Sequence, residues 1–345
     1  MLALTAAGVA MPWVSRAFAQ ERQITVCAYS AIFEDIYKKT VIEPFMAGHP
    51  GIKVNYVGLP TSAQILGTLR AQKAAPQIDV AIMDMTVAKA GGDEAIFAPV
   101  TVEQLPVMRQ LNPRALIEGL PGPAVTFDSI VMLYSPQKFA TAPTSWRELW
   151  NKDHAGRIAV DAPPNALGLG LTFIADNLAG GTNYMESVDK GLELLGEMAP
   201  LVQTWEPKPE VYTAVISGAV DLGIGYNARA QTFSLQTPER IGGALPDEGS
   251  VFQINTINLV NGSAQSDAAL EFMSYALGAE AQKTFTEAMF YAPTNQEADV
   301  APEALARTAA TPERMAKMID VNWIEVANIR DAVTNQWRRQ VLSRG

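Results

Sequence analysis

The sequence predicts an α/β fold in two lobes. Its 345 residues exceed what one hydrophobic core comfortably serves and suit two domains. Short apolar strands alternate with helical stretches in both halves, which is the rhythm of βαβ units in a parallel sheet. No low-complexity linker or internal repeat separates the halves, so we expect the chain to cross between the lobes several times.

The first half shows this rhythm clearly. β-Branched apolar runs predict strands, and apolar residues at helical spacing predict helices. The expected order is a strand at 24–29, a helix at 33–48, a strand at 52–57, a helix at 62–74 and a strand at 78–83.

The second half repeats it. We expect a strand at 158–160, helices at 167–178, 183–198 and 210–217, strands at 221–226 and 251–260, and a mostly helical tail at 302–339. Pro302 and Pro312 fit the first turn of a helix. With crossings near residues 127, 257 and 303, lobe 1 comprises 24–127 plus 258–303, and lobe 2 comprises 128–257 plus 304–345.

The N-terminus has features of an export signal. Residues 2–11 are small and apolar, and Ala17-Phe18-Ala19 follows Pro12 and Arg16. Small residues at the outer positions of this triplet fit a signal-peptidase site, so we predict a signal peptide at 1–19. Because a basic start is missing, the choice between Sec and twin-arginine export and the true start codon stay open. The alternative interpretation is a buried helix of the fold.

Composition argues against several classes of protein. The net charge is −10 with mixed signs, whereas a nucleic-acid partner would require a basic face. The single cysteine, Cys27, excludes an intrachain disulfide, and its apolar surroundings favour a buried strand residue over a reactive thiol. His49 and His154 lack ligands at zinc spacing, so we expect no metal and no cofactor.

Enzyme signatures are also missing. Gly168-Leu169-Gly170 lacks the third glycine of a dinucleotide-binding loop, and no Gly-x-Ser-x-Gly or His-Glu-x-x-His motif occurs. The carboxylate pairs Asp93-Glu94 and Asp247-Glu248 lie in polar, turn-like segments that favour a solvated loop over acid–base catalysis. We therefore predict that the protein is not an enzyme.

Four segments carry a family resemblance. Segments 144–158 and 218–227 are similar to motifs of family 1 extracellular solute-binding proteins, and segments 246–252 and 268–295 resemble motifs of their spermidine/putrescine-binding branch. The residues concerned are Thr144-Ser145-Trp146-Arg147-Glu148-Leu149-Trp150 with His154 to Ile158, Gly218 to Gly223 with Tyr226-Asn227, Pro246 to Phe252, and Ala268 to Met273 with Tyr291 to Asn295. In order and spacing they span most of residues 24–340.

The resemblance implies a two-lobed periplasmic binding protein fold of type II, with a ligand cleft that closes between the lobes. It also implies a periplasmic monomer that passes a small molecule to an inner-membrane ABC permease and ATPase. Trp146, Leu149 and Trp150 share one helix face behind a Thr144 or Ser145 cap, so we expect them in the core rather than at the ligand.

The sequence departs from the polyamine pattern at the expected ligand positions. Tyr226 replaces a tryptophan, Arg229 replaces a small polar residue, and Gln253 and Asn255 replace an aromatic residue and an aspartate. Pro164 and Asn165 align with an expected acidic pair. A dication would lose charge partners in a partly dry cleft, at a cost of roughly several kcal/mol per unmatched charge.

These departures favour a small carboxylate or an ω-amino acid such as 4-aminobutyrate. Arg229 offers a planar fork for a carboxylate, although it could also be a solvated residue or the partner of Glu248. Asp84, Asp128 and Asp161, near strand ends, are candidate ammonium partners. The alternative ligand is a polyamine held in a variant way. Iron(III) is less favoured because it requires clustered tyrosines.

Aromatic side chains could form the walls of the cleft. The candidates are Tyr29, Phe127, Trp205, Tyr226 and Phe252. For Trp205 a place in the hydrophobic core is the equal alternative.

Overall fold

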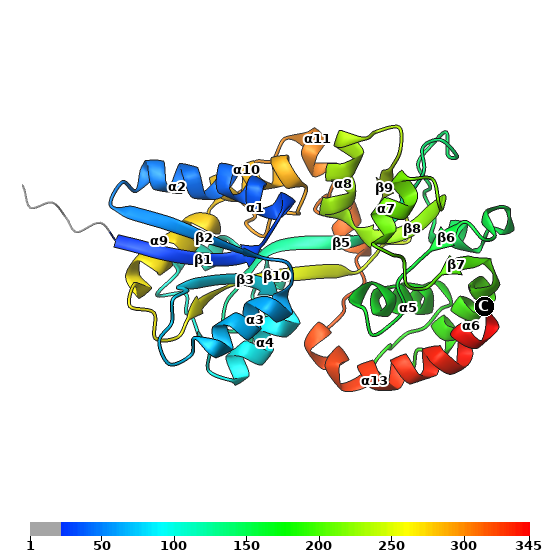
Figure 1. Ribbon diagram of the computed structural model, residues 1–345, viewed down its shortest axis with the longest axis horizontal. Helices are drawn as coiled ribbons and strands as arrows, with labels where there is room; N and C mark the ends of the chain where they lie inside the picture. The colour runs from blue at the N-terminus through cyan, green and yellow to red at the C-terminus, as the bar shows by residue number, and fades with distance from the viewer. Residues whose placement is uncertain (1–21) are drawn as a thin grey trace, which may run out of the picture.

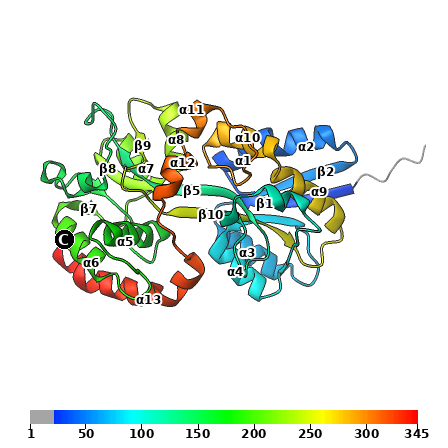
Figure 2. The same ribbon diagram turned by 180° about the vertical axis from the view of Figure 1, so that it is seen from behind.

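The computed structural model describes residues 22–345, and the predicted signal peptide therefore lies outside the described residues. Figure 1 shows two lobes side by side, joined by β5 (Ala124–Tyr134) and β10 (Phe252–Val260). Figure 2 shows α12 (Pro312–Lys317) on the opposite face of these strands, where the chain returns toward the second lobe. The exact boundaries of the lobes stay a prediction.

Lobe 1 contains a mixed sheet covered on both faces. Its strands are β1 (Arg22–Tyr29), β2 (Ile52–Leu59), β3 (Val80–Asp84), β4 (Phe97–Ala98), β10 and the first half of β5. β1 pairs in parallel with β2 and β3, and β10 runs antiparallel to β3, β4 and β5. Its helices are α1 (Ile32–Tyr37), the π-helical turn Lys38–Ile42, α2 (Glu43–Gly48), α3 (Ser62–Ala71), α4 (Met85–Asp93), α9 (Ser266–Ala276) and α10 (Ala279–Met289).

Successive side chains of β1 pack in opposite directions, as the pleat of a strand requires. Val26 belongs to the large core cluster with Phe33 of α1, whereas Cys27 packs with Ile65 of α3. Because helices cover both faces, the strand can be apolar throughout. Cys27 is fully buried, which confirms the interpretation as a core residue.

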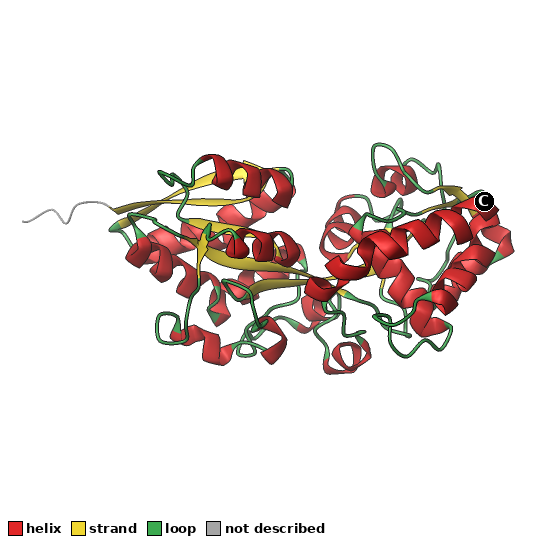
Figure 3. Cartoon of the chain, turned by 90° about the horizontal axis from the view of Figure 1, so that it is seen from below, coloured by secondary structure: helices red, strands yellow, loops and turns green. Residues whose placement is uncertain are grey.

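Lobe 2 is built around the second half of β5. The antiparallel partners of β5 there are β8 (Leu222–Tyr226) and β9 (Gly242–Ala244), while β6 (Ile158–Ala159) pairs in parallel with β8 and with β7 (Val202–Thr204). Its helices are α5 (Ala166–Leu178), α6 (Asp189–Met198), α7 (Val211–Ile216), α8 (Asn227–Gln236) and α13 (Trp323–Gln340). Figure 3 shows α13 running from the lobe boundary to the C-terminus.

Short helices complete the described chain. They are α11 (Pro302–Leu305), α12 and the 3₁₀ turns Pro106–Gln110, Pro113–Ala115, Trp146–Trp150, Lys152–His154, Ala199–Leu201 and Leu342–Arg344. Among residues 22–345, none of the helices has both the length and the apolar character of a membrane span.

β5 is shared by the two lobes. Positions 124–129 pair with β10 and positions 130–134 pair with β8, so one hydrogen-bonded ladder continues from lobe to lobe. The sequence-based list of strands missed β5. Its buried polar residues Thr126, Asp128 and Ser129 interrupt the apolar run that would have marked a core strand.

Most of the other predicted elements are confirmed within one to three residues at either end. Pro302 and Pro312 begin α11 and α12 as predicted. The helix expected at 183–198 begins only at Asp189. The side chain of Asn183 accepts the N–H of Met185 at the start of a turn at 184–186.

Two of the three apolar residues of the tryptophan-rich segment lie in the core as predicted, whereas Trp150 is half-buried at its edge. The side chain of Ser145 caps its 3₁₀ turn by accepting the N–H of Arg147. Trp146 and Leu149 are fully buried behind it.

Candidate ligand-binding site

The carboxyl ends of the parallel strands meet at the lobe boundary. β1 and β3 run toward lobe 2 and end at Tyr29 and Asp84, and β8 runs toward lobe 1 and ends at Tyr226. Ligands of open α/β sheets bind at such ends. The topology therefore gathers side chains from distant parts of the sequence at one place.

A cavity of about 210 Å³ lies where these strand ends meet. Four of the predicted site residues line it, namely Asp84, Tyr226, Phe252 and Gln253. Lobe 1 contributes the start of α4, the crossing strand β10 contributes Phe252 and Gln253, and lobe 2 contributes Tyr226 and the starts of α5 and α13.

Asp84 has both a structural and a cavity-facing role. Its Oδ1 accepts the N–H of Thr86 at 2.8 Å and so caps α4. Its Oδ2 accepts a 3.1 Å hydrogen bond from Nε2 of Gln253. The carboxylate is thus oriented by two neighbours and still lines the cavity.

Tyr29 and Asn255 lie behind this carboxylate in one network. The Tyr29 hydroxyl donates to Oδ1 of Asn255 at 2.8 Å, and Gln253 donates to the same oxygen at 3.0 Å. Asn255 is 1% exposed, and burial raises the pKa of Tyr29 above its ordinary value. These two predicted residues therefore support Gln253 and do not line the cavity themselves.

Asp128 is turned into the protein, contrary to its predicted role as an ammonium partner. It is 4% exposed, and its Oδ1 accepts the N–H groups of Ser129 at 2.8 Å and Ala228 at 3.1 Å. Burial raises its pKa to about 7, against the lowering effect of these hydrogen bonds. Asp128 thus joins the crossing strand β5 to the start of α8.

Arg229 forms an ion pair with another residue of lobe 2. Its guanidinium binds Glu210 through both amino groups, at 2.8 and 3.0 Å, and lies 5.0 Å from the ring centre of Tyr212. The partner is not Glu248, which accepts a hydrogen bond from Ser145. Arg229 does not line the cavity. Its guanidinium, which was expected to hold a carboxylate of the ligand, already binds Glu210.

Three other candidates lie away from the cavity lining. Phe127 is fully buried and packs behind Phe252, with ring centres 5.2 Å apart. Trp205 packs edge-on against Trp337, 5.1 Å between centres, so the core alternative applies. Asp161 accepts a 3.3 Å hydrogen bond from Asn165, and burial raises its pKa.

The C-terminal helix supplies a wall that was not predicted. Trp323, Val326, Ala327 and Arg330 line the cavity from α13. Their spacing of i, i+3, i+4 and i+7 places them on one helix face. An arginine within a mainly apolar face is the signal that could have indicated this wall.

Metal ligation has no support in the described structure. Residues 22–345 contain no group of three or more His, Cys, Asp or Glu side chains that could hold a metal ion.

Comparison with known proteins identifies the family of this chain. Residues 40–316 match the bacterial extracellular solute-binding protein family. The chain belongs to this family. This solute-binding protein is 23% identical to the gamma-aminobutyric acid-binding protein of Pseudomonas aeruginosa, over 95% of this chain and 94% of that protein. It is 22% identical to spermidine/putrescine-binding periplasmic protein 1 of Haemophilus influenzae, over 80% of each chain.

Its fold matches solved structures of the same kind. An ABC transporter structure from Clostridium perfringens superposes with a TM-score of 0.74 at 24% identity, over 92% of this chain and 99% of that one. The predicted resemblance, the two-lobed fold and the transport function are thereby confirmed. As a member of this family, the protein is a solute-binding protein, that is, a protein that binds a small molecule.

Proposed function

We propose that this solute-binding protein captures a small ω-amino acid, with 4-aminobutyrate as the reference ligand, in the cavity between its lobes. It would act as a monomer in the periplasm after export by the predicted signal peptide. The family is extracellular, which supports this location.

One observation carries the choice of ligand. The charged side chains that line the cavity are one carboxylate, Asp84 of lobe 1, and one guanidinium, Arg330 of lobe 2. The apolar rings of Phe252 and Trp323 also line it. One anion and one cation complement a ligand with an ammonium group and a carboxylate, whereas a second ammonium group would meet a like charge.

A polyamine is the second candidate. The spermidine/putrescine-binding relative and the carboxylate of Asp84 favour it. Arg330 counts against it, because placing a second ammonium group near a guanidinium is costly in a partly dry cavity. Iron(III) is less favoured still, since Tyr226 is the one tyrosine among the residues that line the cavity.

A thermal-shift screen tests the proposal. The panel contains 4-aminobutyrate, 5-aminopentanoate, putrescine, spermidine and butyrate. A ligand at about 100 times its dissociation constant adds roughly 2.7 kcal/mol to the free energy of unfolding. We expect the ω-amino acids to stabilise the protein most. Stabilisation by polyamines alone would contradict the proposal.

A further inference from the structure

We infer that Arg330 on α13, rather than Arg229, binds the anionic group of the ligand and determines specificity for it. This inference rests on the proposed function, because it names the carboxylate-binding residue of the same cavity. Three observations support it: the helix face on which Arg330 lies, the free hydrogen-bond donors of its guanidinium, and the contact of α13 with lobe 1.

Arg330 lies where the buried face of α13 passes the cavity. Trp323 and Val326 come before it on this face, and Val333 and Trp337 continue the face into the core of lobe 2. A charged residue within such a stripe is unfavourable for packing unless it meets water or a ligand. The cavity provides that place, since Arg330 lines it and its side chain is 52% exposed.

The guanidinium of Arg330 is available for a ligand. Among residues 22–345 it donates no hydrogen bond, and its nearest acidic neighbour is Asp331, with 3.8 Å between Nε and Oδ1. Asp331 is 92% exposed, so the attraction between the two is weak. Arg229 differs, because Glu210 already binds both of its amino groups. A planar guanidinium with free donors is suited to a carboxylate.

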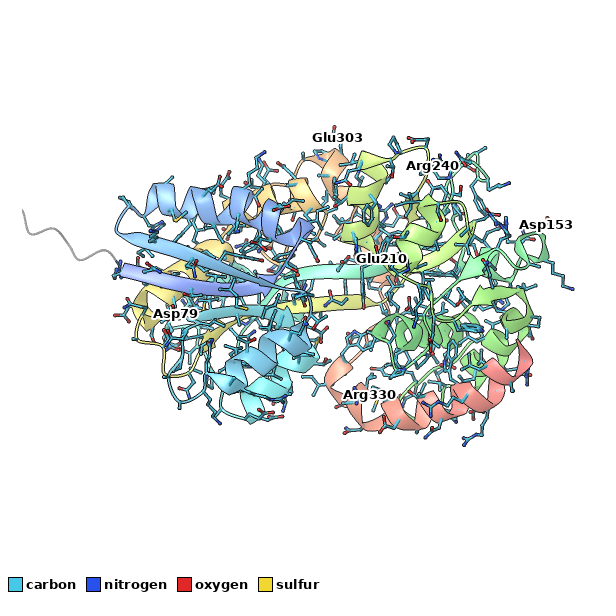
Figure 4. The ribbon with its side chains drawn as sticks, in the orientation of Figure 1. Asp79, Asp153, Glu210, Arg240, Glu303 and Arg330 are labelled. Carbon is cyan, nitrogen blue, oxygen red and sulfur yellow. The ribbon has the colours of Figure 1, made fainter. Side chains whose placement is uncertain are left out.

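The two charged groups of the cavity belong to opposite lobes. Asp84 caps the start of α4 in lobe 1, and α4 contacts α13 of lobe 2 across the boundary. Figure 4 places Arg330 in the half of α13 that is nearer lobe 1. A ligand whose ammonium group meets Asp84 and whose carboxylate meets Arg330 would therefore bind both lobes at once. An amine without an anionic group would bind one lobe only, which explains how the cavity could reject it.

Calorimetry on four variants tests the inference. The variants are Arg330→Gln, Arg330→Lys, Arg229→Gln and, as the matched control on the same helix, Arg338→Gln. The probes are 4-aminobutyrate and 4-aminobutyramide, which keeps the ammonium group and the chain but replaces the carboxylate by a neutral amide.

We expect Arg330→Gln to weaken the binding of 4-aminobutyrate about 10- to 100-fold, as loss of a hydrogen bond to a charged group does. Its affinity for 4-aminobutyramide should stay within about threefold of the wild type, since structural damage would weaken both probes. Arg330→Lys should restore part of the loss, because a point charge cannot reproduce the planar fork. Arg229→Gln and Arg338→Gln should leave the ratio between the probes unchanged.

Two outcomes overturn the inference, and they can be told apart. If the wild type binds 4-aminobutyrate and Arg330→Gln leaves the ratio unchanged while Arg229→Gln lowers it, Arg229 is the carboxylate-binding residue and the proposed function stands. If the wild type binds no ω-amino acid, the proposed function fails and the role of Arg330 fails with it.

Discussion

The indole N–H of Trp323 donates a 2.6 Å hydrogen bond to the carbonyl oxygen of Phe252. Phe252 is the first residue of the crossing strand β10, and Trp323 is the first residue of α13. Both side chains line the cavity. One buried hydrogen bond between α13 and the crossing strand β10 therefore holds the two sides of this cavity wall together.

Substituting Trp323→Phe should reveal this dependence. The variant keeps an aromatic ring but leaves the carbonyl of Phe252 without its partner, which costs about 1–3 kcal/mol of unfolding free energy. Urea denaturation measures the loss. The control is Trp205→Phe, because the indole nitrogen of Trp205 makes no hydrogen bond in the part of the chain that the structure describes. Equal losses in the two variants would argue against a special role for the Trp323 bond.

Asp84→Asn should separate ligand binding from folding. Asparagine caps helices as well as aspartate, so α4 should keep its stability. The affinity for 4-aminobutyrate should fall about 10- to 100-fold with the loss of the charged partner of the ammonium group. Asp93→Asn, at the exposed end of the same helix, is the matched control. Calorimetry that finds equal affinities in the two variants would remove Asp84 from the site.

The fold was largely predictable because its strands and helices follow local patterns of apolar residues. Alternating and β-branched runs predicted β1, β2, β3 and β8. β5 was missed because Asp128 and its neighbours satisfy their polar groups through contacts distant in sequence, such as the hydrogen bond from Ala228. Such partners leave no trace in the local pattern.

The site was only partly predictable, for a related reason. Asp84, Tyr226, Phe252 and Gln253 follow or begin strands, and strand ends are where a ligand is expected. Arg330 sits in the middle of a helix, and only the packing of α13 beside α4 brings it to the cavity.

Asp128→Asn should change how stability depends on pH. The pKa of Asp128 is about 7 in the folded protein and about 3.9 in an unfolded chain. Between these values the folded state binds more protons, so the contribution of Asp128 to wild-type stability falls as the pH rises. Asparagine can accept the same two backbone N–H groups without a charge. Tyr212, Tyr226 and Tyr291 have pKa values raised above 10 and do not titrate in this range.

The measurement is the unfolding free energy of both proteins from pH 4 to pH 8. The unfolding free energy of the variant should rise relative to that of the wild type as the pH rises, by as much as about 4 kcal/mol at pH 8. A difference that stays constant over this range would show that Asp128 does not carry a raised pKa.

Asp221→Asn should have the opposite pH dependence. Arg157 binds both carboxylate oxygens of Asp221, at 2.8 and 3.2 Å, and lowers its pKa. This stabilisation is present above the unfolded pKa of about 3.9 and is lost as the pH falls through the folded value. At pH 7 the unfolding free energy of the variant should be roughly 1–3 kcal/mol below that of the wild type, and this difference should shrink toward pH 3. Glu271→Gln breaks the exposed pair with Arg22, and this control should lose less than about 1 kcal/mol.

Calorimetric titration of the wild type with 4-aminobutyrate, putrescine and butyrate tests the central claim most directly. If one carboxylate and one guanidinium hold the two ends of the ligand, 4-aminobutyrate should bind with a stoichiometry of one. Its affinity should be at least about tenfold higher than that of putrescine, which has only ammonium groups, or of butyrate, which has only a carboxylate. The reason is that each matched end contributes roughly 1.5–3 kcal/mol to the binding free energy. Putrescine binding as tightly as 4-aminobutyrate, or more tightly, would contradict the account.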